Sequence, residues 1–171
     1  MKKQKISAKT VALLAMMIAL ALVFSYVETL IPINFGIPGV KLGLANLVIV
    51  AALYLIGGKE AFLVSVVRIF LSGFMFGNLA SIMYSLAGGL LSLAVMLILK
   101  KTDKLSILAV SVLGGICHNI GQLIVAILVV ENLKLIFYVP VLLISGFVTG
   151  LLIGIVSRVI LPAVRRAYAA D

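Results

Sequence analysis

LASIMYSLAGGLLSLAVMLIL, residues 79–99, carries no charged side chain from its first residue to its last. A helix of this length rises by about 30 Å, which is the thickness of the hydrocarbon core of a bilayer. The charged cluster KKTDK, residues 100–104, follows at once and returns the chain to water. The stretch therefore predicts a transmembrane helix.

Further apolar stretches lie on both sides of it, separated by glycine, proline or charged residues. Hydrophobic residues make up 64% of the 171 residues and charged residues 11%, so a soluble domain would lack the polar surface it needs. We expect a single all-α transmembrane domain over residues 1–171, in a polytopic integral membrane protein. Its six transmembrane helices are predicted at residues 8–27, 42–56, 61–76, 79–99, 105–130 and 135–161.

Basic residues gather on one side of the bilayer when the connections between these helices alternate across it. One side collects Lys2, Lys3, Lys5, Lys9, Lys59, Lys100, Lys101, Lys104, Arg158, Arg165 and Arg166, and the other only Lys41 and Lys134. Cytoplasmic connections carry the excess of basic residues, so both termini are predicted to be cytoplasmic. The net charge of +9 follows from this sorting. We expect no nucleic-acid partner, because no soluble domain presents a basic patch.

Small residues form stripes along two of the predicted helices. Ala8, Ala12, Ala15 and Ala19 follow one another at steps of four, three and four on one face of the first helix. Small side chains let helices approach closely in lipid, so this stripe either packs inside the protein or is reserved for a partner. In the sixth helix, glycines at every fourth position predict an internal seam: Gly146, Gly150 and Gly154.

Arg68 lies inside the third predicted helix. A charged side chain near mid-bilayer costs at least ~2.5 kcal/mol, so Arg68 should face the protein interior or a wet cavity. Its guanidinium suits bidentate binding of a phosphate or carboxylate. A structural arginine that bonds backbone carbonyls or a neighbouring amide is the alternative.

The fifth helix carries a second polar group. Ser111, Gly115, His118 and Gln122 form a stripe on one face, with Asn119 beside it. A lone histidine is more often a packing residue than a ligand contact. The neighbouring amides of Asn119 and Gln122 make a binding role for His118 as well supported as a packing role. No second histidine and no intramembrane carboxylate completes a metal site, so we expect no metal.

The first external connection is rich in proline and glycine and carries Glu28, Asn34 and Lys41, with Asn46 shortly after it. Such a segment could fold as a lid over a cavity that opens to the outside. The predicted substrate-binding cavity is rimmed by Lys41 and lined by Asn46, Arg68, His118, Asn119 and Gln122. Two cations against one carboxylate favour a small anionic ligand.

Several catalytic signatures are absent. The chain has two aspartates, Asp103 and Asp171, too few for the Mg²⁺ cluster of a prenyl diphosphate synthase. No phosphate-binding Walker sequence occurs, because Gly58 and Lys59 are followed by Glu60. No acidic residue is predicted in the membrane core, which disfavours ion-coupled transport. We expect a protein that is not an enzyme and holds no cofactor.

Four segments carry a family resemblance: FSYVETLIPINFGIPGVKLGLANL (24–47), VVRIFLSGFMFGN (66–78), YSLAGGLLS (84–92) and GGICHNIGQL (114–123). They closely resemble the bacterial membrane family called Gx transporter, also called heptaprenyl diphosphate synthase component I. That family looks like the substrate-binding S-components of energy-coupling factor (ECF) transporters. The resemblance implies a six-helix, S-component-like bundle in the bacterial cell membrane.

The resemblance also implies partners. In S-components, alanines of the first helix dock a shared transmembrane subunit, and the first external loop closes over the ligand. Ala8, Ala12, Ala15 and Ala19 match that docking pattern, and Pro38, Gly39 and Lys41 fall in the corresponding loop.

Two functions follow. The first is an S-component-like protein for uptake of a small anionic vitamin-like or isoprenoid/quinone-related molecule, driven by ECF transmembrane and ATPase subunits. The second is a non-catalytic membrane subunit of a heptaprenyl diphosphate synthase. A purely structural membrane protein remains a third reading.

Overall fold

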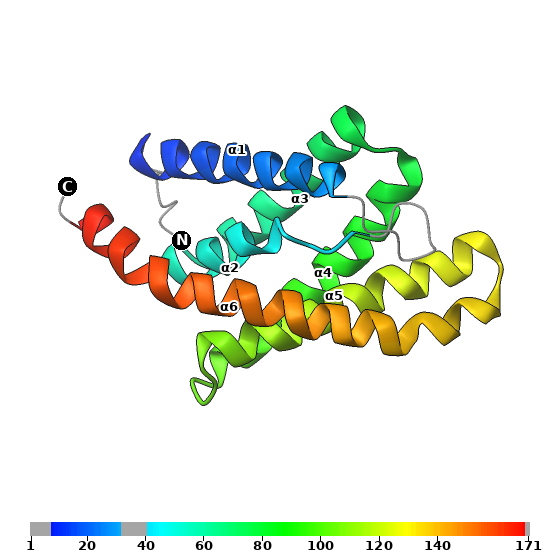
Figure 1. Cartoon of the computed structure of the whole chain (residues 1–171). Helices are drawn as coiled ribbons and strands as arrows, with labels where there is room; N and C mark the ends of the chain where they lie inside the picture. Colours follow the sequence, from blue (N-terminus) through cyan, green and yellow to red (C-terminus); the bar gives the residue numbers. More distant parts are fainter. Residues whose placement is uncertain (1–7, 32–40, 170–171) are drawn as a thin grey trace, which may run out of the picture.

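A computed structural model of the protein describes residues 8–31 and 41–169. The expectations for Asn34, Pro38 and Gly39 therefore lie outside the described residues, as do those for Lys2, Lys3, Lys5 and Asp171. Within the described ranges the chain is helical and has no strand (Figure 1). The elements are α1 (Ala8–Leu30), α2 (Asn46–Leu55), α3 (Gly58–Phe76), α4 (Leu79–Lys101), α5 (Ile107–Val130), the 3₁₀ helix η1 (Leu133–Tyr138) and α6 (Val139–Ala169).

The helices identify an integral membrane protein. Four helical segments are long and apolar enough to cross a bilayer: α1, α4, α5 and the combined stretch Leu133–Arg166. α2 has only 10 residues, which rise by about 15 Å, half of the hydrocarbon core. α3 is long enough but carries Lys59, Glu60 and Arg68. The all-α membrane fold is confirmed, whereas six separate spans stay a prediction.

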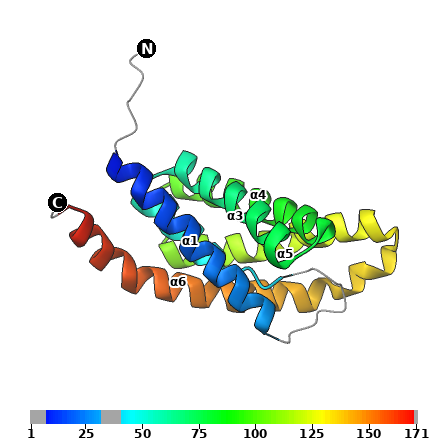
Figure 2. The ribbon, with the colours of Figure 1, turned by 90° about the horizontal axis from the view of Figure 1, so that it is seen from above.

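The four helices α1, α4, α5 and α6 alternate in direction through the bundle (Figure 1). α1 begins and α6 ends at the same end of the molecule in both views (Figure 1, Figure 2). The connection between α4 and α5 lies at this end, and the turn between α5 and η1 lies at the opposite end. The connection that carries Lys104 and the end of α6 that carries Arg165 and Arg166 therefore lie at the same end.

The second helix begins later than the sequence predicts. Residues 42–45 were expected to be helical, but α2 starts at Asn46. Gly43 has a φ of +88°, in the left-handed region that favours glycine, and its carbonyl accepts a hydrogen bond from the Asn46 N–H at 2.9 Å. This turn shortens the predicted span and leaves residues 41–45 as a non-helical segment.

α2 forms the centre of the larger apolar core and packs against α1, α3, α4 and α6. Its apolar sequence NLVIVAALYL suits burial on every face. The helix ends inside the bundle, so its last carbonyls need donors. The Lys100 ammonium donates to the Leu53 carbonyl at 2.5 Å, and Arg165 Nη2 donates to the Tyr54 carbonyl at 2.9 Å. Cationic side chains of α4 and α6 thus supply hydrogen-bond donors to carbonyls in the last turn of α2.

The predicted glycine seam is confirmed between α5 and α6. A methyl group placed on Gly115 would lie 2.4 Å from the Gly146 carbonyl oxygen, and one placed on Gly150 would lie 2.7 Å from the Ser111 carbonyl oxygen. The Ser111 hydroxyl donates to the Gly150 carbonyl at 2.8 Å. The two backbones therefore touch directly along this seam.

Candidate functional site

The alanine stripe lies on the exposed face of α1. Ala8, Ala12, Ala15 and Ala19 are all exposed, whereas the buried residues of this helix lie on the opposite face. The first of the two alternatives was that these alanines pack inside the protein. Within the described bundle they do not. A docking role for the stripe stays a prediction.

Polar side chains from three helices meet inside the protein. Asn46 of α2, Arg68 of α3, and His118 and Gln122 of α5 are exposed by only 6%, 3%, 2% and 0%. Arg68 Nη2 donates to the Asn46 side-chain oxygen at 3.3 Å, and the Gln122 amide contacts His118 Nε2. Gly43 lies between these two pairs of side chains. A methyl group placed on it would lie 3.0 Å from Asn46 Nδ2 and 3.1 Å from His118 Cδ2. These four side chains are the polar cluster.

Lys41 enters this cluster through its backbone. Its N–H donates to Gln122 Oε1 at 2.9 Å, and Gln122 Nε2 donates to its carbonyl at 3.2 Å. One glutamine therefore satisfies both backbone groups of the residue. Burial lowers the pKa of the Lys41 ammonium, and the Glu28 carboxylate acts against this shift. The sequence predicted a lysine at the rim but not this backbone attachment.

Glu28 lies inside the bundle rather than in the external connection. α1 continues to Leu30, and Glu28 is buried on the same face as Ala21 and Ser25. Its carboxylate accepts a hydrogen bond from the Gly43 N–H, and both Arg68 and Lys41 lie within electrostatic range. The expectation that the first helix ends before Glu28 was therefore wrong, whereas the expectation that no acidic residue lies in the membrane core stays a prediction. The helical spacing from Ala21 and Ser25 was the signal that could have placed it.

Asn119 is not part of the polar cluster. Its side chain turns to α6, where Nδ2 donates to the Leu142 carbonyl at 2.8 Å. Consecutive residues of a helix point about 100° apart, so His118 and Asn119 face different neighbours. This contact ties α5 to α6, and the role of Asn119 in substrate binding stays a prediction.

The cluster rests on two glycines of α4. A methyl group on Gly88 would lie 2.6 Å from the His118 carbonyl oxygen, and one on Gly89 would lie 3.9 Å from Arg68 Nη2. These positions bring α4 close enough to close one side of the cluster. Gly88 is therefore explained by the close approach of the α5 backbone, whereas Gly89 faces side chains of α3, the nearest being Ile69 at 3.1 Å.

Arg68 is incompletely satisfied. A guanidinium has five N–H donors, and the described residues supply one hydrogen bond, from Nη2 to Asn46. The buried Nε has no hydrogen-bond partner in this part of the chain. A buried charged donor without an acceptor is costly, so the arrangement suits an anion that supplies one.

The model of one protein family, described as heptaprenyl diphosphate synthase component I, matches residues 17–160. This range contains the polar cluster, Glu28 and the segment that joins them. Comparison with curated proteins and with solved structures gave no match.

Proposed function

The chain belongs to the heptaprenyl diphosphate synthase component I family, and from that premise we propose that it is a membrane-embedded binding protein for a small anionic molecule. The observation that carries the proposal is the buried guanidinium of Arg68, whose Nε lacks an acceptor within the described residues. A carboxylate or phosphate of a vitamin-like or isoprenoid/quinone-related ligand would accept from Nε and Nη2 together. His118 and Gln122 would contact the ligand body.

Glu28 gives the site a way to stay closed without ligand. Its carboxylate balances the buried charge of Arg68 at a distance and holds the Gly43 N–H. Gln122 holds the Lys41 backbone from the other side. An entering anion would compete with Glu28 for Arg68, and the segment 41–43 would have to leave Gln122. Binding and movement of this segment are thereby coupled.

The remaining features of the proposal concern topology and energy. All six helices would cross or enter the plasma membrane of a bacterial cell, with both termini cytoplasmic, and α2 and α3 would form a short pair. The chain would be non-catalytic, and release inside the cell would be driven by a separate ATPase. The exposed alanine stripe of α1 would dock the ECF transmembrane subunit through close helix contact.

Native mass spectrometry of the detergent-purified protein tests the site. The probes are flavin mononucleotide, a prenyl diphosphate and a carboxylated naphthoquinone precursor. A complex with one probe is expected for the wild type and weakened more than tenfold in Arg68→Gln, because a charge-assisted bond contributes about 1.5–3 kcal/mol. Lys134→Gln removes the same charge at a distant exposed site and should bind normally. Equal binding by all three forms, or by none, contradicts the proposal.

A second function is favoured by the family description itself. A component I implies a partner subunit, so the chain would anchor a soluble prenyl diphosphate synthase at the membrane. Lys101, at the end of α4, and Lys104, in the connection that follows it, are exposed and would face that partner beside the half-buried Lys100.

Co-purification separates the two functions. The tagged protein is expressed with the ECF subunits and with the soluble synthase subunit of its host. Recovery of the ECF subunits, lost in Ala15→Trp because the indole blocks close helix contact, is the expected result. Ala163→Trp, at an exposed position of α6, serves as the control. Recovery of the synthase subunit alone, with a change in its product length, would favour the anchoring function.

A further inference from the structure

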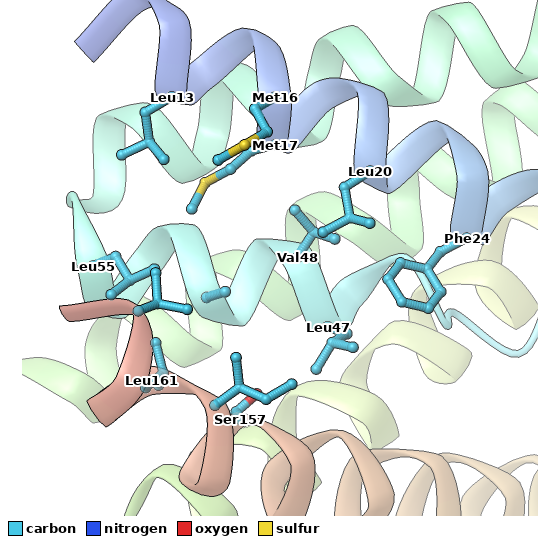
Figure 3. A pocket seen from close by; sticks show the side chains of 13 residues that line it. Leu13, Met16, Met17, Leu20, Phe24, Leu47, Val48, Leu55, Ser157 and Leu161 are labelled. Atoms are coloured by element: carbon cyan, nitrogen blue, oxygen red, sulfur yellow. The ribbon is translucent and has the colours of Figure 1, made fainter. Parts of the chain in front are cut away.

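A groove separate from the polar cluster opens between α1 and α6, with α2 as its floor. Its volume is about 390 Å³. Figure 3 shows side chains of the three helices around a common open space. The lining is apolar apart from Ser157 of α6 and includes Met16 and Leu20 of α1, Ala51 of α2 and Ile160 of α6.

The apolar lining of the groove suits a hydrocarbon chain as its ligand. Water in a cavity needs two to four polar partners, and this lining offers almost none. Met16 and Leu20 on one wall are exposed by 61% and 48%, and Ile160 on the other by 46%, so the groove is open along its side. In an integral membrane protein that side faces the bilayer, where acyl chains are the surrounding solvent. The volume falls within the roughly 300–1,000 Å³ typical of ligand sites.

One end of the groove is basic. Leu55 lines the groove, and the two residues before it accept hydrogen bonds from cations. The Tyr54 carbonyl accepts from Arg165 at 2.9 Å, and the Leu53 carbonyl accepts from Lys100 at 2.5 Å. The Lys100 ammonium also lies 4.9 Å from the centre of the Tyr54 ring. Val164, another lining residue, precedes Arg165 in α6. Arg165 is exposed, so its guanidinium retains donors for an outside anion.

We propose that this groove binds an anionic phospholipid, with one acyl chain between α1 and α6 and the phosphate on Arg165 and Lys100. The guanidinium fork matches phosphate oxygens, and the ammonium adds a second charge beside it. Basic sites between transmembrane helices bind such headgroups on the side where basic residues gather. The site is independent of Arg68 and of the proposed anion-binding function.

Native mass spectrometry after exchange into phosphatidylglycerol or phosphatidylcholine tests the site. One phosphatidylglycerol is expected to stay bound to the wild type and to Lys134→Gln. Arg165→Gln should reduce its retention about fivefold, which corresponds to roughly 1 kcal/mol for one cation. Ala51→Phe should reduce it further by filling the groove, whereas Leu128→Phe on the exposed face of α5 should not. Equal retention of both lipids in every variant overturns the headgroup assignment.

Photolabelling of the wild type covers the case in which Ala51→Phe does not fold. Phosphatidylglycerol with a diazirine in its acyl chain should label Met16, Leu20 and Ile160 more strongly than Phe74 and Leu128, which are also exposed. Uniform labelling of these positions overturns the groove site. Displacement of phosphatidylglycerol by a prenyl monophosphate at lower concentration would instead assign the groove to an isoprenoid phosphate and overturn the phospholipid.

Discussion

Replacing Gly150 with valine is expected to abolish recovery of folded protein. A β-carbon at this position would lie 2.7 Å from the Ser111 carbonyl oxygen and 2.7 Å from the Val112 Cα. Both obstacles are backbone atoms, so no side-chain rotation can relieve them. Overpacking usually costs about 1–3 kcal/mol, and here it would also separate α5 from α6 and break the bond from the Ser111 hydroxyl. Size-exclusion chromatography and thermal unfolding in detergent measure the loss.

Two further variants show whether backbone contact is the cause. Gly150→Ala adds one methyl group and should give an intermediate loss of thermal stability. Ala163→Val adds bulk at an exposed position of the same helix and should leave both measurements unchanged. If Gly150→Val unfolds at the wild-type temperature, α5 and α6 do not pack as described.

Replacing Glu28 with glutamine is expected to lower stability by about 3 kcal/mol, the scale seen when one member of a buried ionic group is removed. The amide can still accept from the Gly43 N–H, so the change is mainly one of charge. Arg68 would then remain buried without its carboxylate neighbour. Adding Arg68→Gln should recover much of the loss, because the remaining cluster is neutral except for Lys41. Thermal unfolding of the wild type, the two single variants and the double variant gives the coupling free energy between Glu28 and Arg68.

Glu131→Gln is the matched control for this cycle. Glu131 is exposed in the turn after α5, and loss of its charge should leave the unfolding temperature unchanged. If Glu28→Gln and Arg68→Gln have additive effects, the two groups do not balance each other and the mode of closure proposed for the empty site is wrong.

The positions of the helices follow from the sequence because, in lipid, the backbone hydrogen bonds must form within each segment of the chain. Backbone groups in hydrocarbon must bond within their own helix, so an apolar run such as residues 79–99 has one structure available. The glycines of α6 were likewise readable, since close contact in lipid calls for small residues at regular spacing. Arg68 and His118 were expected to face the interior because charge and polarity are costly toward lipid.

Only the tertiary structure decided which neighbours these side chains meet. Asn119 was assigned to the cavity by its position next to His118, yet α6 offers it the Leu142 carbonyl. Glu28 was placed in a loop because acidic residues normally end apolar helices, but Arg68 and Gly43 hold it inside. The groove between α1 and α6 has no sequence signal, because its walls come from opposite ends of the chain and α2 forms its floor. Composition and spacing act within one helix, whereas these features depend on contacts between helices distant in the chain.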